Sequence, residues 1–292
     1  MSHRVLITGA NKGIGRALVV DVLSHRDDTH VVLGSRDEGR GRAARDELIA
    51  DHPDWADRLD LLVLDVASEA SVAQAAEQTR QRYGAAGLYA LVNNAGIGPF
   101  GHTYGEVLDI NAEGAHRTSH AFLPQLGDGG RIVNMSSGSA PNFVAACAPA
   151  VQQRFVDPAV TWADVRELMA TGRSLAQSEG DFASAGLSPD AYGLSKAALN
   201  ALTIELARTQ PHLLVNACSP GFIETDLTRR IADARGSTPE AMGMKPVQAA
   251  TRAPMFLLFG DVPASGWYFG SDAERSPLDR YRSPGDPPYT GE

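Results

Sequence analysis

The stretch VLITGANKGIG, residues 5–15, places three glycines directly after a short apolar run. The run predicts a buried strand at Val5–Thr8, and the residues that follow, Ile14–Ser24, have the spacing of an amphipathic helix. Glycines between a strand and a helix allow a tight turn, and they let backbone amides at the helix start approach a phosphate group. Their order, G-x-x-x-G-x-G, differs from the usual G-x-G-x-x-G fingerprint. The stretch predicts the first unit of an α/β fold with a phosphate-binding turn, and a purely structural turn is the alternative.

The same alternation continues along the chain. Short leucine-rich and β-branched runs without polar alternation are typical of parallel strands covered on both faces, and amphipathic stretches separate them. The sequence therefore predicts a Rossmann-type α/β fold, a doubly wound parallel sheet with helices on both faces. The expected strands are Val5–Thr8, Val31–Ser35, Leu61–Val66, Leu88–Asn93, Arg131–Ser136 and Leu213–Ser219. The expected helices are Ile14–Ser24, Glu38–Ala50, Glu69–Tyr83, Tyr104–Leu126 and Ala191–Arg208.

Two segments depart from this rhythm. Residues 141–189 contain no strand candidate, and Thr161 with Asp164 resembles a capping box, so this insert is expected to form one or two helices. The end of the chain, from about Asp272, is rich in Pro, Gly, Ser and charge, and is expected to be extended or poorly ordered. We therefore expect one catalytic domain at 1–271, which includes the insert, and a tail at 272–292.

Composition narrows the class of function. The chain has 292 residues, 43% of them hydrophobic, and a net charge of −9, which is typical of a soluble globular protein and unfavourable for nucleic acid or anionic lipid. No apolar run approaches the length of a membrane span. The two cysteines cannot form a disulfide framework, and no Cys/His cluster has the spacing of a zinc site. We expect a cytoplasmic protein with a small-molecule partner, no metal and no membrane or nucleic-acid partner.

The end of the second expected strand indicates which dinucleotide binds. At this point an acidic residue would accept hydrogen bonds from the ribose 2′-hydroxyl of NAD, but the chain has Ser35-Arg36. An arginine suits a 2′-phosphate, and Lys12 is a second cation near the same turn in a chain with only three lysines. The pair predicts NADP(H), and a solvated surface role for Arg36 is the alternative.

Two further strand ends carry polar residues. Asp65 and Val66 close the third expected strand, and Asn93-Asn94-Ala95-Gly96 follows the fourth. Ligands of open α/β sheets bind at the carboxyl ends of strands, so we expect Asp65 to accept from an adenine amino group. Asn-Asn-Ala-Gly is also an ordinary turn composition.

A tyrosine and a lysine supply candidate chemistry. Tyr192 and Lys196 lie one turn apart on an expected helix, so their side chains face the same way. Lowering a phenol pKa by about 3 units from about 10 requires about 4 kcal/mol, of which a nearby ammonium can supply a part. The tyrosine would then exchange a proton with a carbonyl or alcohol oxygen. Ser137, at the end of another strand, can hydrogen-bond the same oxygen, although serines at strand ends are often turn residues.

Six motifs follow one another along the chain: Thr8-Gly9-x-x-x-Gly13-x-Gly15, Asn93-Asn94-Ala95-Gly96, Asn111, Ser137, Tyr192-x-x-x-Lys196 and Pro220-Gly221. In this order they resemble the motifs of the short-chain dehydrogenases/reductases, over about residues 4 to 270. The resemblance implies that Tyr192 is the general acid/base, that Ser137 polarises the carbonyl, that Lys196 holds the nicotinamide ribose and that Asn111 anchors a relay water. It also implies that Thr225 contacts the nicotinamide carboxamide. The expected coenzyme contacts are Gly9, Asn11, Lys12, Gly13, Ile14, Gly15, Arg36, Asp65, Val66, Asn93, Ala95, Gly96, Tyr192, Lys196, Pro220, Gly221 and Thr225.

The separation of the catalytic residues narrows the resemblance. Tyr192 follows Ser137 by 55 positions, which is longer than is common in the family and is similar to the monomeric NADPH-dependent carbonyl reductases. Residues 152–155 and 216–222 also resemble the corresponding segments of those enzymes. In them the helical insert covers the surface that other members use for dimerisation, so the resemblance implies a monomer. The insert and Phe222 are expected to line the substrate pocket, with Ser137 and Tyr192 at its base, and their apolar character suggests a hydrophobic ketone, aldehyde or quinone.

We therefore expect NADPH-dependent reduction of a carbonyl to an alcohol, with Tyr192 as proton donor. The alternatives are a catalytically silent NADP(H)-binding sensor and an alcohol dehydrogenase that runs in the oxidative direction in a biosynthetic pathway. An epimerase or dehydratase of sugar nucleotides is disfavoured by the glycine spacing and by the lack of a second substrate domain.

Overall fold

One sheet of eight strands forms the centre of the molecule in the computed structural model, which describes residues 3–291. The strands are β1 (His3–Ile7), β2 (Thr29–Ser35), β3 (Leu59–Val63), β4 (Leu88–Asn93), β5 (Leu126–Met135), β6 (Leu214–Cys218), β7 (Tyr268–Phe269) and β8 (Arg275–Ser276). Their order across the sheet is β3-β2-β1-β4-β5-β6-β7-β8. The pairings from β3 to β7 are parallel, and β8 pairs antiparallel with β7. The predicted doubly wound α/β fold is confirmed.

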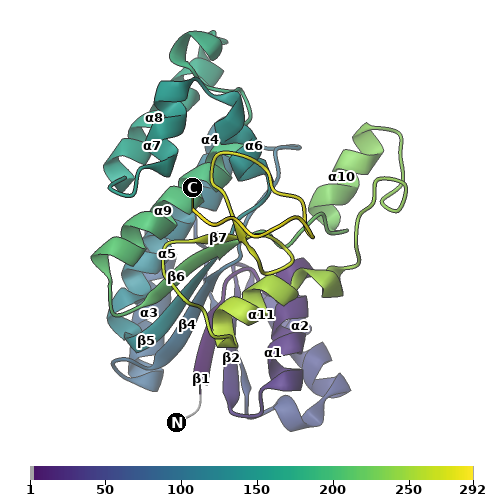
Figure 1. Cartoon of the computed structure of the whole chain (residues 1–292). Helices are drawn as coiled ribbons and strands as arrows, with labels where there is room; N and C mark the ends of the chain where they lie inside the picture. The colour runs from purple at the N-terminus through teal and green to yellow at the C-terminus, as the bar shows by residue number, and fades with distance from the viewer. Residues whose placement is uncertain (1–2, 292) are drawn as a thin grey trace.

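Helices cover both faces of the sheet (Figure 1). They are α1 (Gly13–His25), α2 (Glu38–Asp51), α3 (Glu69–Tyr83), α4 (Tyr104–Leu108), α5 (Gly114–Phe122), α6 (Ser139–Ala146), α7 (Pro149–Val156), α8 (Trp162–Gln177), α9 (Ala191–Thr209), α10 (Asp226–Ala234) and α11 (Arg252–Phe259). None of these helices, within residues 3–291, combines the length and apolarity that crossing a membrane requires.

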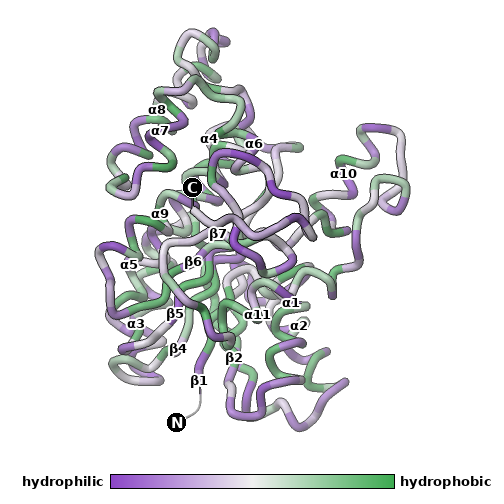
Figure 2. The backbone as a smooth tube through the Cα atoms, viewed as in Figure 1, coloured by the Kyte–Doolittle hydropathy of each residue, from purple (hydrophilic) through white to green (hydrophobic). Residues whose placement is uncertain are grey.

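The apolar runs of the strands follow from burial on both sides. In β1, Leu6 belongs to the core that α3, α5 and α9 cover, whereas Val5 and Ile7 belong to the core under α1, α2 and α11. Successive side chains of a strand point to opposite faces, so a strand covered twice has no polar alternation. Figure 2 shows the same arrangement, with hydrophobic residues concentrated in the central strands and on the inner sides of the helices.

The strand order reverses between β1 and β4, where the chain crosses from one half of the sheet to the other. Thr8 joins the two strand ends: its Oγ1 accepts from the backbone N of Asn94 at 3.0 Å and of Ala95 at 2.9 Å. In open α/β sheets the ligand crevice lies at such a switch point, outside the carboxyl ends of the strands.

The insert is helical, as its sequence predicts, and it contains more helix than the one or two segments expected. Helix α6 begins just before residue 141, and α7 and α8 follow within the insert. The predicted capping box starts α8: the Thr161 side chain accepts from the backbone N of Asp164, and the Asp164 carboxylate accepts from the backbone N of Thr161. Both α7 and α8 pack against α9. The insert therefore covers the outer side of the helix that carries the candidate catalytic pair.

The helix predicted over Tyr104–Leu126 is broken. Its middle is a π-helical turn, η2 (Asp109–Glu113), between α4 and α5, and it ends in a short 3₁₀ turn, η3 (Leu123–Gln125), directly before β5. A π turn adds one residue to the helical path and is common at functional sites. The turn contains Asn111, one of the predicted catalytic residues.

The segment after Asp272 differs from the extended or poorly ordered tail that its composition predicts. It forms β8 and then folds back on the domain, where Arg282 forms an ion pair with Asp272 and its Nε donates to Ser276 Oγ at 3.0 Å. The Arg275 guanidinium lies over Trp267, 4.0 Å from the ring centroid, and beside Tyr289 at 5.0 Å. Composition cannot predict these contacts because it does not specify how the segment turns back on itself.

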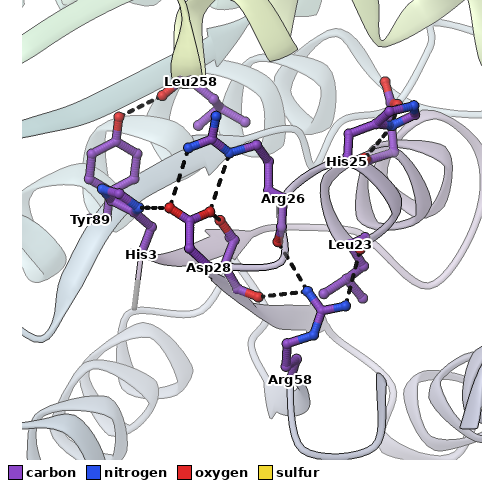
Figure 3. Close-up of polar contacts among 10 residues, drawn as sticks. His3, Leu23, His25, Arg26, Asp28, Arg58, Tyr89 and Leu258 are labelled. Atoms are coloured by element: carbon purple, nitrogen blue, oxygen red, sulfur yellow. Dashed lines mark hydrogen bonds and ion pairs between the residues drawn. The ribbon is translucent and has the colours of Figure 1, made fainter. Parts of the chain in front are cut away.

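The opposite end of the sheet is held by charged and polar side chains (Figure 3). At the start of β1, His3 Nδ1 lies 3.0 Å from Asp28 Oδ2, and Arg26 Nε lies 3.3 Å from Asp28 Oδ1. Arg58 Nη1 donates to the carbonyl of Arg26 at 3.0 Å, and the Tyr89 hydroxyl donates to a backbone carbonyl of α11 at 2.7 Å. These charged and polar groups find their partners within the protein, so we assign them a structural role.

Candidate active site

A cavity of about 870 Å³ lies at the carboxyl ends of the strands, at the switch point. Among the predicted coenzyme residues, Gly9, Asn11, Lys12, Gly13, Ile14, Gly15, Arg36, Asp65, Val66, Ala95, Gly96, Tyr192, Lys196, Pro220 and Thr225 line it. The predicted residues that lie outside its lining are Asn93, Asn111, Ser137, Gly221 and Phe222. The predicted residues in the lining come from the ends of five strands and from α9, and Met135 and Ser136 add the end of β5.

The glycine turn at the start of α1 leaves space for a ligand and presents free backbone amides to it. Gly9 has φ +63°, and a Cβ there would lie 2.9 Å from Ala95 Cα, while a Cβ on Gly15 would lie 2.6 Å from Asn94 Nδ2. Larger residues are therefore excluded. Helix α1 has no side-chain cap and no acidic residue in its first turn, so its N-terminal amides remain available to an anion. The turn fits a pyrophosphate.

Arg36 lies at the other end of the lining, exposed at the end of β2. Arg40, one turn further along at the start of α2, also lines the cavity and lies 3.5 Å from Asp37 Oδ2 through its Nη2. Sequence reasoning missed Arg40. Its signal was its place in the first turn of the helix that follows Arg36, because that turn begins at the carboxyl end of β2.

Lys12 is not a free cation in this structure. Its Nζ forms an ion pair with Asp226 Oδ2 at 2.6 Å, and both side chains are exposed. Asp226 is the first residue of α10, so the pair connects the glycine turn to α10 across the cavity. The predicted contact of Lys12 with the coenzyme therefore competes with a partner that is 214 positions away.

The predicted contact of Asn93 is not supported by its position. Asn93 is buried, and its Nδ2 donates to Ser119 Oγ and to Asn134 Oδ1, both at 2.8 Å. Its neighbour Asn94 lines the cavity instead and donates to the carbonyl of Thr8 at 2.8 Å. The two roles divide because successive residues at a strand end point to opposite faces.

The predicted catalytic pair lies on adjacent turns of α9. Lys196 Nζ is 5.7 Å from the centroid of the Tyr192 ring, and both residues line the cavity. The ammonium donates to the carbonyl of Met135 at 2.8 Å. A Cβ on Gly96 would lie 3.7 Å from Lys196 Nζ, so the absence of a side chain at this position leaves the lysine open to the cavity.

Burial sets the ionisation of both groups in the absence of a coenzyme. It raises the pKa of Tyr192 to about 12, against the favourable effect of the Ser137 hydroxyl on the phenolate. Burial lowers the pKa of Lys196 to about 8. The tyrosine pKa expected from sequence, below its usual value, is not seen here because desolvation of the phenolate outweighs the stabilising contacts. Tyr192 consequently carries its proton at neutral pH.

Ser137 lies just after β5, beside Tyr192. Its hydroxyl is close enough to favour ionisation of the phenol, and it donates to Ser139 Oγ at 3.3 Å. Its Oγ also accepts from the backbone N of Ser139 at 3.1 Å, which fixes the turn into α6. Ser137 is therefore held next to the tyrosine, and its neighbour Ser136 lines the cavity.

Asn111 connects three parts of the site from within the π turn. Its Oδ1 accepts from the backbone N of Ile97 at 2.8 Å, and its Nδ2 donates to the carbonyl of Ile97 at 2.9 Å and to Ser195 Oγ at 3.1 Å. Ser195 in turn donates to the carbonyl of Tyr192 at 2.7 Å. Sequence reasoning missed Ser195, whose only signal was its place inside the Tyr-x-x-x-Lys motif.

Comparison with known proteins agrees with this geometry. The family model described as "short chain dehydrogenase" matches residues 3–149, about half of the chain. The chain belongs to the short-chain dehydrogenase family. Carbonyl reductase (NADPH) 3 of Rattus norvegicus is 34% identical to this dehydrogenase over 271 residues, which cover 85% of the chain and 93% of the relative. Carbonyl reductase (NADPH) 1 of Homo sapiens is 33% identical over 271 residues, with 86% and 92% covered.

A solved structure shows the same fold. The menthone neomenthol reductase from Mentha piperita superposes on this dehydrogenase with a TM-score of 0.73 at 27% identity. The superposition covers 93% of this chain and 99% of the reductase. The resemblance to short-chain dehydrogenases, and within them to carbonyl reductases, is confirmed.

The segment after β6 places the remaining predicted residues of the dehydrogenase. Thr225 is the N-cap of α10 and faces the glycine turn: a Cβ on Gly13 would lie 3.9 Å from its Cγ2. Gly221 has φ +95° and abuts Ser271 rather than the cavity. Phe222 is 40% exposed and also lies outside the lining, so its predicted substrate contact stays a prediction.

Proposed function

We propose that this protein reduces a hydrophobic ketone, aldehyde or quinone with NADPH. The observation that carries the proposal is that Tyr192, protonated at neutral pH, lines the same cavity as the glycine turn of α1. The carbonyl reductase relatives, whose names specify NADPH, support both the reaction and the coenzyme.

The residues of the chain then have distinct roles. NADPH, when bound, supplies a hydride to the carbonyl carbon. Tyr192 donates its proton to the carbonyl oxygen, so its O–H bond breaks as the hydroxyl of the product forms. Ser137 donates a hydrogen bond to the same oxygen and stabilises the negative charge that develops there. Because the pKa of Tyr192 is about 12, the phenol carries its proton at neutral pH, which is the form that donates to a carbonyl oxygen.

The phenolate that remains on Tyr192 must be stabilised and reprotonated. Lys196 supplies a positive charge 5.7 Å from the tyrosine ring, which favours the phenolate. Asn111 holds Ser195, which bonds the Tyr192 carbonyl, and thereby fixes this turn of α9. We retain the prediction that Asn111 also anchors a relay water.

Removing the tyrosine hydroxyl tests the chemistry. We expect Tyr192→Phe to lose turnover by roughly 100-fold or more, because a positioned acid contributes that much to a proton transfer. The loss of NADPH absorbance with methyl phenyl diketone measures turnover, and titration of NADPH fluorescence measures coenzyme binding, which should stay unchanged. Tyr289→Phe is the matched control outside the site. Full turnover by Tyr192→Phe would overturn the mechanism, and NADPH binding by a wild type that reduces no carbonyl would favour the silent sensor.

The coenzyme preference rests on Arg36 at the cavity, with Arg40 one turn away. A guanidinium pairs well with a phosphate, and an acidic residue here would favour the free 2′-hydroxyl. We expect Arg36→Asp to raise KM for NADPH by roughly tenfold or more and to leave KM for NADH unchanged or lower. Arg42→Asp makes the same charge change on α2 outside the cavity lining. An unaltered NADPH preference in the Arg36 variant would contradict this assignment.

We also infer that the protein is a monomer, because α7 and α8 pack on α9 and cover its outer side. Light scattering at micromolar concentration tests this, and the expected mass is that of one 31.0 kDa chain.

A further inference from the structure

Three exposed aromatic residues lie on segments next to the candidate active site. Among residues 3–291, the large hydrophobic side chains that stay substantially exposed are Val63 (39%), Phe100 (39%), Phe222 (40%) and Tyr281 (52%). Phe100 lines the cavity, and Phe222 directly follows Pro220 and Gly221. Tyr281 is the most exposed of the three aromatic residues and, like Phe222, lies outside the lining of the cavity.

Tyr281 comes from the C-terminal segment and lies against the serine loop. A Cβ on Gly138 would be 2.8 Å from Tyr281 Cε2 and 3.2 Å from its Cδ2, so the ring edge packs where Gly138 has no side chain. Gly138 directly follows Ser137 and is the N-cap of α6. The tyrosine ring therefore stands beside the residue that is proposed to hold the carbonyl oxygen.

The residue next to Tyr281 fixes its position. Arg282, whose side chain is only 6% exposed, pairs with Asp272, which is 12% exposed. Arg282 Nη1 also donates to the carbonyl of Asp286 at 2.6 Å, and the backbone N of Gly285 donates to Asp272 Oδ2 at 2.9 Å. The segment is thus folded around one buried ion pair.

The ion pair of Arg282 with Asp272 lies close to the carboxyl ends of the strands. Asp272 follows β7 by three positions, and β7 pairs with β6. A Cβ on Gly221 would lie 3.2 Å from Ser271 Cβ, so the start of the tail touches the segment that carries Phe222. Figure 1 shows the tail in yellow looping across the carboxyl ends of the strands, near α6. Tyr281 and Phe222 therefore belong to segments that are packed together.

We propose that Tyr281 is a specificity-determining residue, which contacts a flat apolar group, such as an aryl ring, on the carbonyl substrate. This inference rests on the proposed reductase function. One edge of the ring packs on Gly138, and the exposed half is free to stack on a ligand. No hydrogen bond joins its hydroxyl to another residue within the described range, 3–291.

Two diketones that differ in one group test the proposal. Methyl phenyl diketone and dimethyl diketone present the same vicinal dicarbonyl, and only the first carries an aryl ring. We expect Tyr281→Ala to lower kcat/KM for methyl phenyl diketone about tenfold, equivalent to about 1.4 kcal/mol, through a higher KM. The value for dimethyl diketone should change less than about twofold. Tyr281→Phe should behave as the wild type.

Controls separate a substrate contact from loosening of the tail. Tyr289→Ala removes another aromatic ring of the tail, one that lies beside Arg275 rather than Gly138. It should leave the ratio of kcat/KM for the two diketones unchanged. An unchanged ratio in Tyr281→Ala, or an equal change in Tyr289→Ala, overturns the proposal and leaves the reductase function intact.

A binding measurement keeps the two proposals distinguishable. If the wild type consumes no NADPH with either diketone, the reductase function fails. Calorimetric titration of the NADP⁺-loaded protein with acetophenone needs no turnover, and we expect Tyr281→Ala to weaken this binding about tenfold. An unchanged Kd would overturn the contact by itself.

Discussion

At the scale of single residues, the charge on Lys196 is needed for the proposed chemistry and opposes folding. Lys196 is only 6% exposed, and burial lowers the pKa of its ammonium from 10.5 to about 8. The unfolded chain therefore binds this proton more tightly than the folded protein. Keeping the ammonium charged at neutral pH costs the coenzyme-free fold on the order of 3 kcal/mol, offset in part by the hydrogen bond to the Met135 carbonyl.

This opposition gives a prediction about pH. Because the folded pKa is depressed, stability from this group rises with pH between about 8 and 10.5, where the unfolded chain holds the proton and the folded protein does not. We expect Lys196→Met to lose activity. We also expect its free energy of unfolding, relative to that of the wild type, to be higher near pH 7 than at higher pH. This gap should shrink as pH rises through the window. Urea unfolding without coenzyme measures the gap.

Lys245→Met is the matched control, because Lys245 is exposed on the loop before η5 (Val247–Ala250). Its stability relative to the wild type should not depend on pH in this window. A gap for Lys196→Met that is constant with pH would contradict the burial argument.

At the scale of elements, sequence predicted best what depends on local pattern. The capping box of Thr161 and Asp164 marked the start of α8, and the apolar runs marked the first six strands. Helix α11 was missed because its eight residues include Pro254, which reads as a break. The π turn at Asn111 was missed because one added residue hardly changes the spacing of apolar positions.

In the candidate site, too, sequence predicted the residues that depend on local spacing and missed the contacts between distant segments. Tyr192 and Lys196 were found because both lie on one helix, where spacing fixes which side chains face the same way. The ion pair of Lys12 with Asp226 and the contact of Tyr281 with Gly138 join positions far apart in the chain. Such pairs depend on how the elements pack, and no local pattern signals them.

At the scale of the whole molecule, the two ends of the sheet differ in how their polar groups are used. The carboxyl ends open on the cavity, whereas the amino ends are closed by ion pairs (Figure 3). Asp60 is the strongest case at the closed end: its side chain is 14% exposed, and it bonds His30 Nε2 at 2.6 Å as well as Tyr83 and Arg82. We infer that this end carries stability independently of the active site.

Removing the Asp60 charge tests that separation. Burial alone would raise the pKa of this carboxyl, but hydrogen bonds from His30 and Tyr83 and the charge of Arg82 hold it well below 3.8. A depressed carboxyl pKa stabilises the fold above the unfolded value, and this stability is lost as pH falls below it. We therefore expect Asp60→Asn to unfold about 2–4 kcal/mol more easily at neutral pH.

The expected gap between Asp60→Asn and the wild type narrows as pH falls below about 4, because the carboxyl of the unfolded wild-type chain binds a proton there while the folded carboxylate does not. Activity of the folded variant with NADPH and methyl phenyl diketone should stay within about twofold of the wild type, since Asp60 lies at the amino end of β3, away from the cavity lining. Asp46→Asn removes an exposed carboxylate beside Arg45 and should change stability by less than about 1 kcal/mol. A large loss of kcat/KM in Asp60→Asn at full folding would show that the two ends of the sheet are coupled, which the arrangement of these polar groups argues against.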